Sequence, residues 1–158
     1  MEFVVAPADV EELEVGDPVE VAKENARRKA AAVDGELVLG VDTVVALDGR
    51  IYGKPGDEDV AGATLRALSG RTHEVVSGLA IGAEVTSAVT RVTFRTVTEP
   101  LLQWYVETGE WRDRAGGYAI QGRGAALVTA IDGDYLNVVG LPVAQLLARM
   151  PGLLWGAR

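Results

Sequence analysis

The sequence contains no cysteine and only one histidine, His73. The lack of cysteine excludes disulfide bonds and thiolate metal sites, and one histidine cannot build a histidine-rich metal site, so we interpret His73 as structural. No stretch of about 18 residues is apolar, so we expect no transmembrane helix. The acidic start also lacks the basic region of a signal peptide. These absences favour a soluble cytoplasmic protein without a membrane partner.

Positive charge is scarce as well. The formal net charge is −8 at pH 7 over 158 residues. This balance argues against binding to a nucleic-acid polymer, which requires clustered cations along the phosphate track. A single nucleotide needs only a few placed cations and remains compatible with the composition. Three of the fifteen cationic residues are lysines, namely Lys23, Lys29 and Lys54, so each lysine is a candidate for a specific role.

What the chain does contain is a regular succession of strand and helix patterns. Its length suits one domain, or two small lobes that share one sheet. We expect strands at 2–6, 37–47, 74–83 and 86–97, a strand pair at 124–131 and 135–139, and helices starting near 18, 58, 98 and 142. Tight turns indicate antiparallel pairing, and the intervening helices permit parallel crossovers. The sequence therefore predicts an α/β fold with a mixed sheet flanked by helices.

Turn and cap residues set the boundaries of these elements. Asp17 and Asp57 are expected N-caps of the first two helices, and Glu20 would complete a capping box with Asp17. Asp48-Gly49 is a strong type I′ hairpin signal, and Asp132-Gly133 indicates a second hairpin.

An aspartate interrupts the apolar strand expected at 37–47. An unpaired charge in an apolar site costs several kcal/mol, so Asp42 either has a cationic partner or lies at a cleft. A carboxylate there could hold a divalent ion or accept a proton from water, and the neighbouring hydroxyl of Thr43 could bind a substrate. The competing interpretation is a strand-end aspartate that caps a loop.

Two lysines and a glycine-rich stretch are further candidates. Lys54, held by Pro55 just past the first hairpin, is a plausible phosphate ligand or an ordinary turn lysine. Lys29, at the edge of the apolar stripe of its helix, could reach a cleft or be solvated. In AGGYAIQG at 115–122, the glycines would permit close approach to a ligand, and Gln121 could bind the edge of a base. The competing interpretation is a structural glycine-rich turn with a surface glutamine. The pattern GxxxxGK[ST] is absent, which excludes a P-loop.

Taken together, these segments resemble the Maf family of nucleoside triphosphate pyrophosphatases. The matching motifs are Asp42-Thr43-Val44-Val45, Gly53-Lys54-Pro55, Leu68-Ser69-Gly70-Arg71-Thr72-His73, Asp113-Arg114-Ala115-Gly116-Gly117-Tyr118, Gln121-Gly122 and Val139-Gly140-Leu141-Pro142. Several ordered motifs at family spacing are far more specific than any one of them. The resemblance runs from about Phe3 to Met150. It implies a single Maf-like domain over 1–158, with an inosine-triphosphatase-like fold of an elongated mixed sheet and two lobes around a cleft.

The resemblance also implies the chemistry. It implies hydrolysis of a nucleoside triphosphate to the monophosphate and pyrophosphate, with a divalent metal cation, Mg²⁺ or Mn²⁺. Carried over by position, Asp42 would be the catalytic carboxylate, and Glu12 would help it to place metal or water. Lys29 and Lys54 would neutralise the phosphates.

Thr43 and Gln121 match the positions that the family associates with preference for dTTP and UTP. Family members usually begin with a strand and a Ser-x-Ser-Pro-Arg-Arg loop that grips the phosphates, whereas this sequence starts past them. We therefore expect an N-terminally shortened domain that hydrolyses slowly and self-associates, and a homodimer is possible. The alternative function is a nucleotide-binding or regulatory homologue with impaired catalysis.

Overall fold

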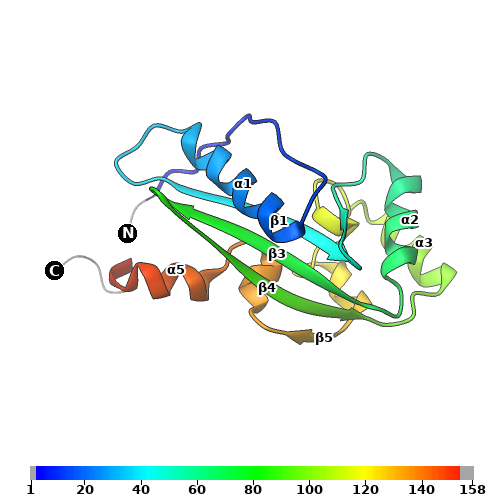
Figure 1. Ribbon diagram of the computed structural model, residues 1–158. Coiled ribbons are helices and arrows are strands. Elements are labelled where there is room, and N and C mark those ends of the chain that lie inside the picture. The colour runs from blue at the N-terminus through cyan, green and yellow to red at the C-terminus, as the bar shows by residue number, and fades with distance from the viewer. Residues whose placement is uncertain (1–2, 154–158) are drawn as a thin grey trace.

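The computed structural model describes residues 3–153, which form one five-stranded sheet with helices on both faces (Figure 1). The strand order is β2-β1-β3-β4-β5. The strands are β1 Leu39–Leu47, β2 Arg50–Tyr52, β3 Thr72–Ile81, β4 Glu84–Phe94 and β5 Val128–Asp132. The expected α/β class, an elongated sheet flanked by helices, is confirmed.

Every strand pair in the described part of the chain is antiparallel, whereas a mixed sheet was expected. The helix between β2 and β3 does return the chain in the same direction, as a parallel crossover would. However, β1 pairs with both β2 and β3 and lies between them, so the two parallel strands are not neighbours.

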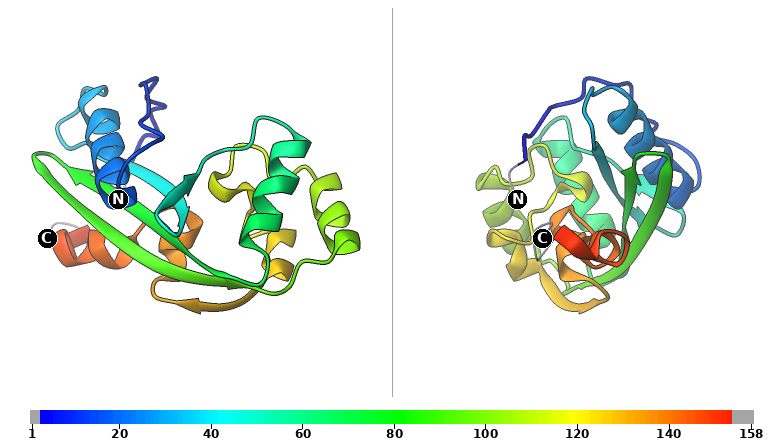
Figure 2. Two further views of the ribbon diagram at one scale, coloured as in Figure 1. Left: turned by 45° about the vertical axis from the view of Figure 1, so that its right-hand side comes forward. Right: turned by 90° about the vertical axis from the view of Figure 1, so that its left-hand side faces the viewer.

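The helices are divided between the two faces and the two ends of the sheet. They are α1 Pro18–Ala31, α2 Glu58–Leu68, α3 Glu99–Glu107, α4 Tyr135–Val139 and α5 Val143–Arg149, with 3₁₀ turns η1 Ala115–Gly117, η2 Arg123–Leu127 and η3 Pro151–Leu153. Helix α1 covers one face and α5 lies on the other (Figure 1). Helices α2 and α3 lie side by side at the opposite end of the long strands from α1 (Figure 2).

The predicted caps and the first hairpin are confirmed, with one exception. The Asp17 carboxylate accepts hydrogen bonds from the backbone N–H groups of Val19 and Glu20, at 3.0 and 3.1 Å. Asp48 and Gly49 adopt φ angles of 52° and 77°, as a type I′ turn requires. The predicted capping box is wrong, because the Glu20 carboxylate pairs with Lys23 on the helix surface instead.

Two strand predictions are wrong. Residues 135–139 form α4 rather than a strand, because the Asp134 carboxylate accepts a hydrogen bond from the Leu136 N–H and starts a helical turn. In the strand expected at 2–6, residues 3–6 are exposed and form no strand, and Met1 and Glu2 lie outside the described residues.

Two separate hydrophobic cores lie on opposite faces of the sheet. The smaller core lies beneath α1 and consists of Val21, Ala22, Val44 and Val76. The larger core joins α2 and α3 to the other face of the sheet, with Leu65, Tyr105 and Val75 among its fully buried members. The alternation of β1 divides its residues between them, since Val44 belongs to the small core and Val45 to the large one.

Two glycines let α1 approach the sheet unusually closely. A Cβ atom on Gly78 of β3 would lie 2.1 Å from the backbone oxygen of Ala22, and one on Gly40 of β1 would lie 2.2 Å from that of Ala26. No larger residue fits at either position without moving the helix. In the sheet register Gly78 pairs with Asp42, so this close contact brings the side chains of α1 directly over that carboxylate.

Candidate functional site

Asp42 is the buried centre of a polar cluster between α1 and the sheet. The residue is 6% exposed, and both of its carboxylate oxygens are engaged. Lys29 Nζ lies 2.5 Å from Asp42 Oδ1, and the Asn25 amide donates to Asp42 Oδ2 at 3.0 Å. The sequence expectation of a cationic partner for Asp42 is thereby confirmed, and the alternative of a loop-capping aspartate is not.

Lys29 joins Asp42 to a second carboxylate. The Lys29 ammonium lies 2.7 Å from Glu12 Oε1. Glu12 belongs to the irregular segment that precedes α1. Lys29 is therefore not a solvated surface lysine. Burial lowers the pKa of the Lys29 ammonium, but hydrogen bonds to Asp42 and Glu12 outweigh burial and raise the pKa above its ordinary value. The lysine therefore stays charged between two carboxylates.

Glu12 remains ionised at neutral pH and partly open to solvent, with 34% of its side chain exposed. Burial raises the pKa of Glu12, but the Lys29 ammonium, with a contribution from the charge of Lys54, holds the pKa below its ordinary value. The predicted trio of Asp42, Lys29 and Glu12 is thus brought together in space.

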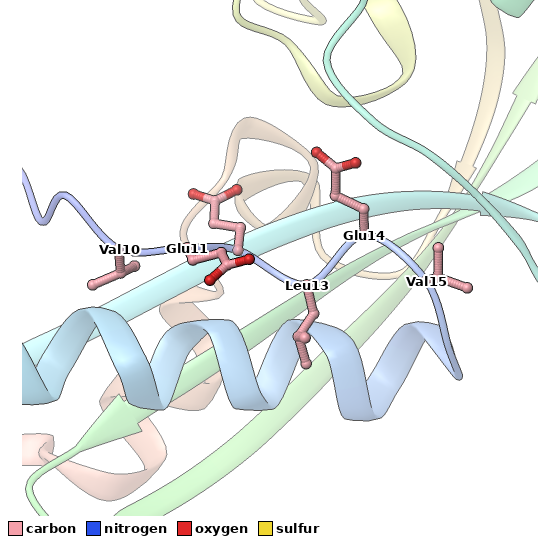
Figure 3. Close-up of a pocket in the computed structure, with 6 residues that line it drawn as sticks. Val10, Glu11, Leu13, Glu14 and Val15 are labelled. Atoms are coloured by element: carbon pink, nitrogen blue, oxygen red, sulfur yellow. The ribbon is translucent and has the colours of Figure 1, made fainter.

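The segment that carries Glu12, residues 10–15, runs alongside α1, and we call it the strap (Figure 3). The Leu13 side chain points toward α1 and Glu14 points away from it. The strap borders an open cavity of about 580 Å³. It is fixed to α1 by Asn25, whose side chain bonds to both the N–H and the carbonyl of Leu13, at 2.7 and 3.0 Å.

Lys54 is exposed beyond the end of β2, and its charge reaches Glu12. The glycine-rich turn holds this lysine in place. Gly116 donates its N–H to the Gly53 carbonyl at 3.1 Å. Its φ is 68°, and a Cβ atom there would lie 2.9 Å from the Val45 side chain, so no larger residue fits. Gly116 therefore has the structural role of a turn residue, and the role of Gln121 in binding a base stays a prediction.

Thr43 lies on the other face of β1 from Asp42, as alternation along a strand requires. Its hydroxyl is 2.7 Å from the Ser77 hydroxyl and 3.5 Å from the Gly140 carbonyl, which follows α4. Thr43 therefore does not belong to the Asp42 cluster, although it is the next residue in the chain.

Gln121 is exposed in a separate open pocket of about 390 Å³. Arg112, Arg114 and Glu110 share this pocket. No hydrogen bond in the described part of the chain joins Gln121 to Thr43 or to the Asp42 cluster. The pairing of Gln121 with Thr43 as a base-binding unit thus remains a prediction.

His73 is fully buried and bonds to a tyrosine, consistent with the structural role expected of it. Its Nε2 lies 2.9 Å from the Tyr118 hydroxyl, and its ring packs edge-on against Phe94 at 4.9 Å. Burial lowers the pKa of His73 to about 4, so the ring is neutral in the folded protein at neutral pH.

Asn25, the second polar partner of Asp42, was not predicted from the sequence. A signal was present, because Asn25 precedes Lys29 by four residues and therefore shares its helix face. That face is otherwise apolar where it meets the sheet, with Ala22 and Ala26 fully buried. A polar residue on the buried side of a helix indicates a buried polar partner.

Two possible features are absent from residues 3–153. None of the helices there is long and apolar enough to cross a membrane. No three histidine, cysteine, aspartate or glutamate side chains in that range gather into a metal site of their own. Asp42 and Glu12 are thus the two carboxylates that Lys29 brings together, rather than parts of a larger acidic cage.

Comparison with known proteins matches the chain to one family. The model of the family described as Maf-like protein matches residues 1–152. Among curated relatives, a dTTP/UTP pyrophosphatase of Pyrococcus furiosus is 43% identical, covering 92% of this chain and 82% of the relative. Proteins of the same name from Symbiobacterium thermophilum and Moorella thermoacetica are 48% and 50% identical, over 89% and 86% of this chain and 78% and 75% of the relatives.

Proposed function

This chain belongs to the Maf-like protein family, and we propose that it is a nucleoside triphosphate pyrophosphatase that hydrolyses dTTP and UTP. The observation that carries the proposal is the buried Asp42 carboxylate, which Lys29 joins to Glu12 in the strap that borders an open cavity. Relatives that are 43–50% identical to this chain over the aligned residues carry that activity in their names.

In the proposed reaction, water attacks the α-phosphorus and the bond to the β-phosphate oxygen breaks. The products are the nucleoside monophosphate and pyrophosphate. Water is a poor nucleophile and the triphosphate repels it, so a base and several positive charges are needed. Asp42 orients the water and accepts its proton, and Glu12 orients the water from the strap side. Lys29 and Lys54 offset the charge of the phosphates.

The Asp42 and Glu12 carboxylates also fit a divalent cation, Mg²⁺ or Mn²⁺. Such ions commonly bind through one or two carboxylates and complete their shell with water and substrate phosphates. Two carboxylates joined by one lysine, with Glu12 partly exposed, match that donor set better than an all-protein cage. When bound, the ion would neutralise phosphate charge and lower the pKa of bound water.

Thr43 and Gln121 are proposed to select the base. Uracil and thymine each present two carbonyl acceptors and one N–H donor, which an amide and backbone groups can match. We further propose that the enzyme works in the cytoplasm, where nucleoside triphosphates are used, and that it can form a homodimer.

Product analysis tests the proposed reaction. The purified protein is incubated with UTP and Mg²⁺, and the products are followed by ³¹P NMR. The proposal predicts UMP and pyrophosphate in equal amounts. Formation of UDP and inorganic phosphate, or no turnover of UTP and dTTP alike, would refute it.

A further inference from the structure

Asn25 connects the Asp42 carboxylate to the strap that carries Glu12 through a single buried side chain. It is 1% exposed and lies on α1, one helical turn before Lys29. Its amide oxygen accepts from the Leu13 N–H at 2.7 Å, and its amide nitrogen donates to the Leu13 carbonyl at 3.0 Å and to Asp42 Oδ2 at 3.0 Å. The amide therefore bonds to the strap on one side and to the candidate base on the other.

We infer that Asn25 is a positioning residue for catalysis, which acts through Asp42 and through the strap that carries Glu12. The inference rests on the proposed function, because it assigns Asn25 to the pyrophosphatase site. Glu12 is the residue next to Leu13. Because Asn25 holds the Leu13 backbone, it also restricts the backbone position from which the Glu12 side chain extends.

The strap needs this attachment because it has few other anchors. Residues 10–15 belong to no helix or strand, and the side chains of Leu13, Glu14 and Val15 are exposed. In the described contacts, the strap is otherwise held to α1 by the Glu12–Lys29 pair and by Arg28, whose guanidinium donates to the Glu11 carbonyl at 2.9 Å. An ion pair between partly exposed side chains holds a backbone weakly.

Lys29 and Asn25 bond to different oxygens of the Asp42 carboxylate. Lys29 takes Oδ1 and Asn25 takes Oδ2, so the carboxylate is held from both sides in one rotamer. A neutral amide orients the carboxylate without adding a second positive charge. A misplacement of about 1 Å in such a group can lower a rate by about 100-fold.

The test is the variant Asn25→Ala, which removes all three bonds. We expect kcat for UTP to fall by about tenfold or more while KM changes less than about threefold, because the substrate-binding groups stay in place. We also expect the Leu13 amide to exchange with deuterium faster than in the wild type. A merely structural role would leave kcat of the folded fraction unchanged.

Asn137→Ala is the matched control. Asn137 is also a fully buried asparagine, and its amide donates to the Val75 carbonyl and Thr90 hydroxyl on the opposite face of the sheet from Asp42. It should lower stability to a comparable extent and leave kcat within about twofold of the wild type, because the two sites are independent.

Each outcome decides between the two proposals. Wild-type kcat in folded Asn25→Ala, or a rise in KM at unchanged kcat, overturns the positioning role. If Asn25→Ala does not fold, Asn25→Asp decides instead, since it keeps the volume and the bond to the Leu13 N–H but loses the donor to Asp42. Wild-type kcat in that variant overturns the inference. If the wild-type protein hydrolyses no nucleotide, the proposed function is refuted. In that case, faster deuterium exchange of the Leu13 amide in Asn25→Ala than in the wild type would still support the attachment of the strap by Asn25.

Discussion

Asp42 is a charged residue on the buried face of strand β1, where apolar side chains are the norm. Its two carboxylate oxygens bind Lys29 and Asn25. Asp42→Asn is nearly isosteric but removes the charge on which the proposed base depends. We expect kcat to fall by more than about 100-fold, with the fold retained because Lys29 still pairs with Glu12. Pyrophosphate release and circular dichroism measure the two effects. A folded variant with near-wild-type turnover would show that Asp42 is not the catalytic carboxylate.

Lys54 offers a second test at the residue scale. An exposed ammonium that faces the developing charge acts mainly in the transition state, so Lys54→Ala should lower kcat/KM for UTP by about tenfold or more. Binding of UMP, measured by calorimetry, should change much less.

Lys23→Ala provides the control for removal of any lysine charge, because Lys23 pairs with Glu20 on the surface of α1. Equal losses in UTP turnover for the two lysine variants, or equal losses of UTP and UMP affinity in Lys54→Ala, would argue against a phosphate role for Lys54.

The site residues could be predicted from the sequence only in part. Asp42 was found because a charge in an apolar strand requires a partner, and Lys29 because it lies at the edge of an apolar stripe. The grouping of Glu12 with them came from family resemblance, since nothing in an irregular segment fixes its place. The position of Thr43 on the opposite face from Asp42 follows from strand alternation, yet only the structure shows what each face meets.

At the scale of the element, the close packing of α1 on the sheet places Lys29 and Asn25 over Asp42. Gly78→Ala would put a Cβ atom 2.1 Å from the Ala22 carbonyl oxygen, a backbone atom that can move only with its helix. We expect the free energy of unfolding to fall by about 1–3 kcal/mol and kcat by about tenfold or more. Urea unfolding and steady-state kinetics measure both.

Gly56→Ala is the stability control for this substitution. Its new Cβ atom would meet no atom of residues 3–153 within 4 Å, apart from its immediate neighbours. The free energy of unfolding should change by less than about 0.5 kcal/mol. If Gly78→Ala is as stable and as active as this control, the close approach of α1 does not position the site.

Elements with strong local signals could be predicted, and those without them could not. Asp17 and Asp57 cap their helices through the bonds expected of them. Residues 135–139 contain Tyr135 and two valines, which favour a strand, but the cap from Asp134 and tertiary contacts together form a helix there. The buried Asn137 amide bonds to the Val75 carbonyl, across 62 residues of sequence, which no local pattern reveals.

At the scale of the whole molecule, the buried His73 makes stability depend on pH. Burial lowers its pKa to about 4 in the folded protein, from an ordinary value of 6.5. The unfolded chain therefore binds the proton first as pH falls. The stabilising contribution is complete above about pH 6.5 and is lost progressively as pH falls toward 4.

We expect the wild-type protein to be less stable at pH 5 than at pH 7.5, with His73 accounting for about 2 kcal/mol of the difference. Urea unfolding at the two pH values measures it. His73→Gln removes the titrating group and should reduce the difference by that amount. An identical pH dependence in the two proteins would show that His73 titrates normally in the folded state.

Substrate preference is best measured as pyrophosphate release from dTTP, UTP, ATP and GTP, each with Mg²⁺ and in pairwise competition. A pocket built around the acceptors and donor of a pyrimidine rejects bases that leave those groups unpaired. We expect dTTP or UTP to have a kcat/KM at least about tenfold above those of ATP and GTP. A purine triphosphate as the best substrate, or no pyrophosphate from any of the four, would contradict this expectation.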